Sequence, residues 1–155
     1  MTRIEGVRSE KAVLVGVLLP NRTFREDPLE ELAGLARTVG ARVEEQLVQR
    51  REVPDRATYL GKGKLEALKL LVEQSGADVV LFDNDLSPAQ TRNLEKTLRV
   101  KVIDRTELIL DIFAHRARTS EARLAVELAQ LEYSLPRLKQ MWTHLSRIEG
   151  GIGMR

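Results

Sequence analysis

The hydrophobic and polar positions of this 155-residue chain follow two different patterns. In the first hundred residues, short apolar runs alternate with amphipathic stretches of helical spacing. The runs at 12–19 and 79–83 are almost wholly apolar and predict strands buried on both faces, and 42–49 and 100–103 predict two more. Strands that alternate with helices indicate a parallel sheet. We therefore expect an α/β fold with a small, open, parallel four-stranded sheet and helices on both faces.

Turn and cap residues predict where the helices of this part begin. Asp27, Ser87 and Asp104 are each followed three residues later by Glu or Gln, the spacing of a capping box. Pro28 and Pro88 stand at the first helical position, where proline is favoured. Helices are expected over 28–39, 62–74, 88–98 and 107–117.

After residue 104 the pattern is helical alone and carries a heptad seam. Its seven members, at alternating spacings of four and three, are Leu124, Leu128, Leu131, Leu135, Leu138, Trp142 and Leu145. This seam predicts a long C-terminal helix of coiled-coil type, kinked at Pro136 but in one register. The partner of the seam is expected elsewhere in the chain, in a second copy, or in sequence beyond it. We expect an α/β subdomain at 1–104 and a helical subdomain at 105–155.

Charge adds one detail to this division. Residues 1–104 hold 17 basic and 17 acidic side chains, whereas 105–155 hold 8 basic and 6 acidic ones. Within 137–155 there is one acidic residue, Glu149, against four basic ones, which are Arg137, Lys139, Arg147 and Arg155. The far end of the long helix is thus electropositive and suits phosphate contacts, although charge runs more often mark a solvated surface.

Few residues suggest catalysis or metal binding. The chain has no cysteine and two distant histidines, so neither thiol chemistry nor a zinc site is expected. Gly61, Lys62, Gly63 and Lys64 lack the spacing and the Ser or Thr of a P-loop, which predicts a surface turn and no nucleotide hydrolysis by this chain. No apolar run is long enough to span a bilayer, and a cytoplasmic protein is expected.

An acidic cluster is the one alternative site. Asp83, Asp85 and Asp104 follow the last two predicted strands, where open α/β sheets place their ligands. They could form a receiver-like or Mg²⁺-binding site, or serve only as caps and turn residues.

Three segments of the chain carry a family resemblance. The runs FDNDLSPAQTRNLE at 82–95, VIDRTELILDIFAHRARTSEARLAVELAQLEYSLPRL at 102–138 and GGIG at 150–153 closely resemble the amino-terminal region of HflX-type GTPases. The resemblance implies a ribosome-associated GTPase whose own GTPase domain, with its GTP and Mg²⁺, is absent from this chain. It also implies that the seam pairs with a second, antiparallel helix beyond Arg155, in a hairpin cut at its loop.

The family further implies a role for the hairpin. Its members bind the large ribosomal subunit and separate stalled or idle ribosomes, reaching toward the peptidyl transferase centre through the hairpin loop. By position, the ribosomal RNA contacts would be Gly150, Gly151, Gly153 and Arg155, with Lys139 and Arg147 as phosphate partners. Because this chain lacks the second helix, we also expect that its seam could form a homodimer.

Overall fold

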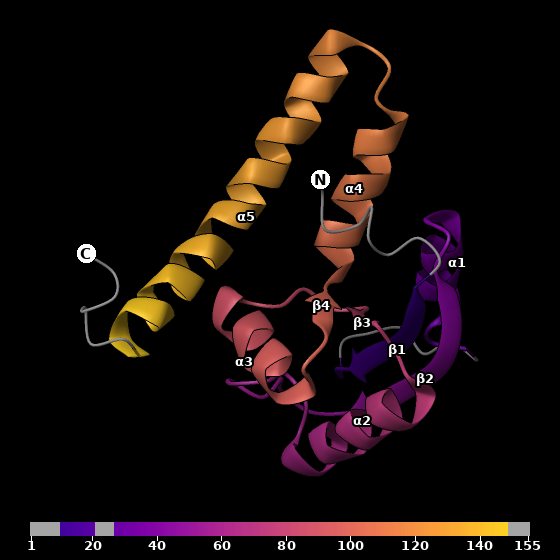
Figure 1. Ribbon diagram of the computed structural model, residues 1–155. Helices are drawn as coiled ribbons and strands as arrows, with labels where there is room; N and C mark the ends of the chain where they lie inside the picture. The colour runs from indigo at the N-terminus through magenta and orange to yellow at the C-terminus, as the bar shows by residue number, and fades with distance from the viewer. Residues whose placement is uncertain (1–9, 21–26, 149–155) are drawn as a thin grey trace.

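The computed structural model describes residues 10–20 and 27–148, with side chains as far as Arg137, and Figure 1 shows its ribbon. In chain order the elements are β1 (Lys11–Leu18), α1 (Glu30–Thr38), β2 (Arg42–Arg50), α2 (Lys62–Ser75), β3 (Val79–Phe82), α3 (Pro88–Leu98), β4 (Lys101–Ile103), α4 (Arg105–Arg116) and α5 (Ser120–Ile148). Each predicted strand and helix is present, with its ends within two residues of the predicted ones.

The four strands form one parallel sheet in the order β2-β1-β3-β4. β1 lies in the middle, pairing with β2 from Lys11 opposite Arg42 and with β3 from Ala12 opposite Val79. The β1 run has no polar side chain from Ala12 to Leu18, which suits a strand with neighbours on both sides and helices above and below. The predicted open parallel α/β sheet is confirmed.

The core has two layers, one on each face of the sheet. Alternate strand residues such as Leu14 and Leu81 pack with α1 and α4, and their neighbours Val15 and Phe82 pack with α2 and α3. The period-two alternation of strand side chains thus serves two helical layers. α4 shares the layer of α1 through Leu108 and Ile112, which are buried there.

Of the three expected capping boxes, the one at Ser87 is complete and the one at Asp104 has its N-cap half. Ser87 accepts from the Gln90 N–H while the Gln90 side chain accepts from the Ser87 N–H, so both halves of this box are present. Asp104 caps α4 by accepting from the Glu107 N–H. The expected box at Asp27 is wrong, because α1 begins later, after Leu29, and the Asp27 carboxylate accepts from the Leu29 N–H within a preceding turn.

A Ser87→Ala variant tests the intact box. We expect the free energy of unfolding to fall by about 1 kcal/mol, since one N–H of the first turn of α3 loses its acceptor. Urea denaturation measures this loss. The same change at Ser75, whose hydroxyl makes only a 3.4 Å contact at the end of α2, should cost less than about 0.5 kcal/mol. Equal effects of the two variants would contradict the assigned role of Ser87.

α5 is one continuous helix of 29 residues that includes Pro136. It turns back after α4, lies beside α4 and α3, and its later turns extend away from the sheet (Figure 1). At 1.5 Å per residue it is about 43 Å long. Within residues 10–20 and 27–148, no helix is both long and apolar enough to cross a membrane.

Candidate RNA-binding arm and the junction at its base

α5 has two different faces along its described part. The leucines of the seam up to residue 135 are exposed, with relative accessibilities of 57–65%. The half-buried positions recur on another face and are Ala122, Val126, Ala129, Gln130, Tyr133, Ser134 and Arg137. Because α5 contacts α3 and α4, this second face is the one that packs on the α/β layer. Leu124, Leu128, Leu131 and Leu135 therefore remain available to another helix.

The residues predicted to bind RNA lie at or beyond the edge of the described structure. Lys139 and Arg147, like the seam residues Leu138, Trp142 and Leu145, lie in the helical backbone of α5, and their side chains are outside the described part. Gly150, Gly151, Gly153 and Arg155 lie outside the described residues altogether. Their assignment as RNA contacts stays a prediction.

Asp83, at the end of β3, is held in an ion-paired chain. Its carboxylate is 1% exposed and lies 3.1 Å from the guanidinium of Arg105, at the start of α4. Arg105 also binds Glu31 of α1. Hydrogen bonding to Glu31 raises the pKa of Arg105, with the charges of Glu31 and Asp83 acting in the same direction. This carboxylate thus ties β3 to α4.

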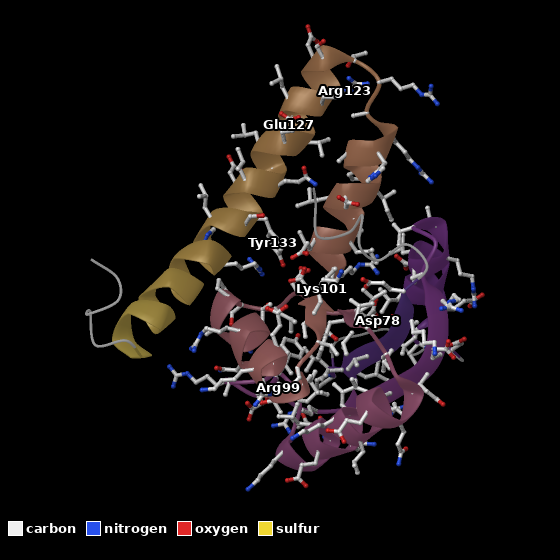
Figure 2. The ribbon with its side chains drawn as sticks, viewed as in Figure 1. Asp78, Arg99, Lys101, Arg123, Glu127 and Tyr133 are labelled. Carbon is white, nitrogen blue, oxygen red and sulfur yellow. The ribbon has the colours of Figure 1, made fainter. Side chains whose placement is uncertain are left out.

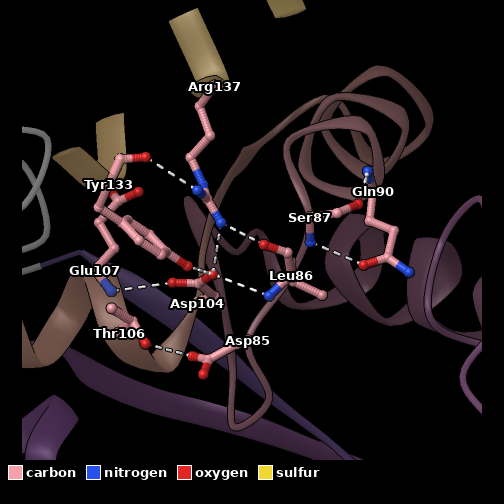
Figure 3. Close-up of polar contacts among 9 residues, drawn as sticks. All are labelled: Asp85, Leu86, Ser87, Gln90, Asp104, Thr106, Glu107, Tyr133 and Arg137. Carbon is pink, nitrogen blue, oxygen red and sulfur yellow. Dashed lines mark hydrogen bonds and ion pairs between the residues drawn. The ribbon is translucent and has the colours of Figure 1, made fainter. Parts of the chain in front are cut away.

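The two residues after Asp83 are also engaged within the fold. The Asn84 side chain accepts from the Val17 N–H at 2.9 Å and donates to the Val17 carbonyl at 3.0 Å. Asp85, which is exposed, accepts from the Thr106 hydroxyl (Figure 3). Asn84 therefore bridges β1 and β3 at the edge where such sheets commonly bind ligands.

Asp104 is the centre of a buried polar junction (Figure 3). One carboxylate oxygen accepts from the Glu107 N–H at 3.0 Å, and the other accepts from the Leu86 N–H at 3.0 Å. The second oxygen also accepts from the Tyr133 hydroxyl and lies 3.3 Å from the Arg137 guanidinium. The side chain is only 2% exposed, so these contacts replace its hydration. Asp104 therefore joins β4, α4, the approach to α3, and α5.

Arg137 reaches this junction across the ring of Tyr133, which Figure 2 shows on the side of α5 that faces the α/β layer. The guanidinium stacks 3.6 Å from the ring centroid, donates to the Tyr133 carbonyl at 3.0 Å, and donates to the Leu86 carbonyl. The Arg137 side chain is 12% exposed. Arg137 therefore does not belong with the electropositive end of the helix, because its guanidinium is paired with Asp104 and Leu86 inside the protein.

The Tyr133 hydroxyl acts as a donor in this junction. Burial raises the pKa of Tyr133 above its ordinary value, and the hydrogen bond and charge of Asp104 raise it further. The phenol thus stays protonated under all ordinary conditions. Sequence reasoning missed this residue, although its spacing of four from Arg137 places both on one helix face.

The Gly61–Lys64 segment forms the entry to α2. Gly61 precedes the helix and donates its N–H to the Gln49 side chain at 2.9 Å. The turn before it is closed by Asp55, whose pKa is lowered chiefly by hydrogen bonds from the Thr58 and Ala57 N–H groups. Gln90 of α3 donates to the Asp55 carbonyl at 2.9 Å. These contacts make the segment part of the packing between β2, α2 and α3.

The geometry of the acidic cluster argues against a metal site in it. Asp83, Asp85 and Asp104 each face a donor group of the protein, and no cluster of three metal-ligating residues occurs among the residues described. The predicted capping role of Asp104 is confirmed.

Family models cover most of the chain. Residues 26–114 match the model described as GTP-binding GTPase N-terminal, and residues 116–155 match the GTP-binding GTPase Middle Region. The boundary between the two matches, at residue 115, falls in the last turn of α4. The division expected at residue 104 is a separate matter and stays a prediction.

Curated relatives are identical to this chain at nearly half of the aligned positions. The GTPase HflX of Flavobacterium psychrophilum is 46% identical over an alignment of 157 positions, which covers 100% of this chain and 38% of the relative. Those of Caldanaerobacter subterraneus subsp. tengcongensis and Escherichia coli are 50% and 47% identical, each over 94% of this chain and 34% of the relative. The chain thus spans little more than a third of the length of these relatives.

A solved structure has the same fold. A GTP-binding protein from the archaeon Sulfolobus solfataricus, crystallised with GDP, superposes with a TM-score of 0.60 and 26% sequence identity. The match covers 86% of this chain and 40% of the archaeal chain.

Proposed function

The chain belongs to the HflX family of GTPases, and from this premise we propose that it is the ribosome-binding region of such a protein. In this proposal the α/β layer is a base and α5 is one arm of a helical hairpin. The end of the arm contacts ribosomal RNA of the large subunit, in the cytoplasm, and helps to separate or rescue ribosomes. The chain itself binds without hydrolysing nucleotide.

The observation that carries the proposal is the form of α5. A helix of 29 residues that exposes four leucines in heptad register has the surface of one member of a coiled-coil pair. A pair of such helices is a stiff rod, and a rod can carry a binding loop far from the base. Lys139, Arg147, Gly150, Gly151, Gly153 and Arg155 are the proposed RNA-contacting residues at its end.

Two partners of the seam follow from the same proposal. In a chain as long as the relatives, a second helix after residue 155 covers the leucines, and a GTPase domain beyond it binds GTP and Mg²⁺. In this chain alone, a second copy takes the place of that helix and forms a homodimer. Both arrangements remove the exposed leucines from water, which is the physical drive for either.

Binding to isolated large ribosomal subunits tests the proposal. We expect this chain to bind at low salt, with an affinity that falls as salt rises because phosphate contacts release counterions. Arg147→Glu combined with Arg155→Glu should weaken binding at least about 10-fold and reduce the salt slope by about 2. Filter binding or co-sedimentation across a salt series measures both quantities.

A matched control separates local contacts from net charge. Lys69→Glu with Lys96→Glu changes the net charge equally on exposed positions of α2 and α3. The affinity of this control for the large subunit should lie within about 2-fold of that of the parent chain, because only the long-range electrostatic attraction changes. No binding at low salt, or equal losses in the two double variants, would contradict the RNA-contacting role of the arm.

A further inference from the structure

The face of α5 that meets the α/β layer offers little apolar surface. Of its seven half-buried positions, only Val126 is an aliphatic residue larger than alanine. The two largest side chains on this face, Tyr133 and Arg137, both end at the polar junction around Asp104. The attachment of α5 therefore depends on polar contacts far more than the attachments of α1–α4, each of which buries aliphatic residues in the core.

The polar contacts also converge on very few atoms. Tyr133 and Arg137 share one carboxylate oxygen of Asp104, and Arg137 adds the Leu86 carbonyl. The Leu86 N–H binds that same carboxylate oxygen, so the three groups form a closed ring. Hydrogen bonds weaken steeply with angle, so a rotation of α5 disrupts the contacts of Tyr133 and Arg137 together and leaves the bond between the Leu86 N–H and Asp104 in place.

The connection between α4 and α5 is suited to such a rotation. α4 ends at Arg116, its C-cap residue Ala117 has an extended backbone, and Thr119 caps the next helix by accepting from the Ala122 N–H. Only Arg118 separates these two residues. Each helix end thus has its own cap, and one exposed contact crosses the segment, from the Arg123 side chain to the Ala117 carbonyl at 3.2 Å. A change in the dihedral angles of the segment breaks that contact without melting either helix.

We infer that Tyr133 and Arg137 are positioning residues, forming with Asp104 a latch that fixes the direction of α5 and releases it as a unit. The hinge lies at residues 117–119. This inference deepens the proposed function, because the direction of the arm decides where its RNA-contacting end can reach. Asp104 keeps α4 capped in either state through its other oxygen.

The absence of cysteine from the chain allows a direct test in solution. Cysteines introduced at the exposed positions Lys69 of α2 and Glu132 of α5 carry nitroxide labels, and double electron–electron resonance gives their distance distribution. Position 132 lies about 20 Å from the hinge along α5. A tilt of about 20° therefore moves that label by about 7 Å, which the method resolves.

The parent chain should give one narrow distribution. Tyr133→Phe combined with Arg137→Met removes the hydroxyl and the guanidinium, and should broaden the distribution or add a second distance. Arg137→Lys keeps the charge but not the planar fork, and should give an intermediate width. Thr106→Val is the control, since it removes the Asp85 contact at the same edge without touching α5, and it should match the parent.

Circular dichroism and urea unfolding of each labelled variant show that it is folded. A folded double variant with the parent distribution would overturn the latch, since the direction of α5 would then be set by other contacts. If the double variant does not fold, the single variants Tyr133→Phe and Arg137→Lys provide the test. Distance distributions like that of the parent in both single variants would also overturn the latch. The test contains no ribosome, so loss of ribosome binding by the parent chain contradicts the proposed function while leaving the latch result intact.

Discussion

An Asp104→Ala variant should lose about 3–5 kcal/mol of unfolding free energy, the usual cost of removing one partner from a buried, hydrogen-bonded ion pair. The carboxylate accepts from two backbone N–H groups and the Tyr133 hydroxyl, and it faces the Arg137 guanidinium. Its removal leaves these donors in a site that is almost closed to water. The loss is a large part of the 5–15 kcal/mol typical of a folded domain. Urea denaturation with linear extrapolation measures it.

Two controls show what the charge and the site each contribute. Asp104→Asn keeps an acceptor for the cap of α4, since asparagine is a good N-cap, but its amide nitrogen then faces three donors, the Leu86 N–H, the Tyr133 hydroxyl and Arg137, and the variant should cost about 1–3 kcal/mol. Asp85→Ala removes an exposed carboxylate at the same edge and should cost less than about 0.5 kcal/mol. Similar losses for Asp104→Ala and Asp85→Ala would show that the junction does not contribute to stability as described.

Replacing Leu128 and Leu131 with glutamate should abolish self-association of this chain. Both side chains are more than half exposed, so their burial in a dimer would stabilise it by about 1.5–3 kcal/mol each. Two acidic residues on each facing helix also repel. Together these effects predict a dimer dissociation constant raised at least about 100-fold. Sedimentation equilibrium over a micromolar concentration series measures it.

The unfolding free energies of such variants distinguish the two faces of α5. Because the seam is exposed in the monomer, the double glutamate variant should keep the stability of a monomeric parent within about 1 kcal/mol. Val126→Glu, on the face that packs on the α/β layer, should destabilise the monomer instead. A parent chain that is monomeric at tens of micromolar would contradict the dimer prediction.

The sheet could be predicted because its signals are local. β1 and β3 are continuous apolar runs, and Ser87, Gln90 and Gly76 mark helix ends through contacts within a few residues. The same local reading fails at α1, where Asp27 has the residue pattern of a capping box but its carboxylate closes a turn instead. Pattern alone does not distinguish an N-cap from a turn that precedes the helix.

The junction could not be predicted for a different reason. Arg137 meets Asp104 across 33 residues of sequence, and nothing in either neighbourhood identifies the other. The sequence pattern of α5 also emphasises the exposed face and not the face that contacts α3 and α4, because large leucines give a stronger signal than small and polar residues. Tyr133 and Arg137 on one helix face are the only local clue to that contact.

The order of strands in the sheet has a consequence for how the chain grows during synthesis. Among the four strands, β1 is made first, gains one neighbour with β2 and the other with β3, and the sheet is complete once β4 has followed. Domains fold as units from the amino terminus as they emerge. The base can therefore finish folding, with the acceptor oxygens of Asp104 already in place, before the first turn of α5 leaves the exit tunnel. α5, the last of the described elements to be made, then docks on the surface formed by α3 and α4.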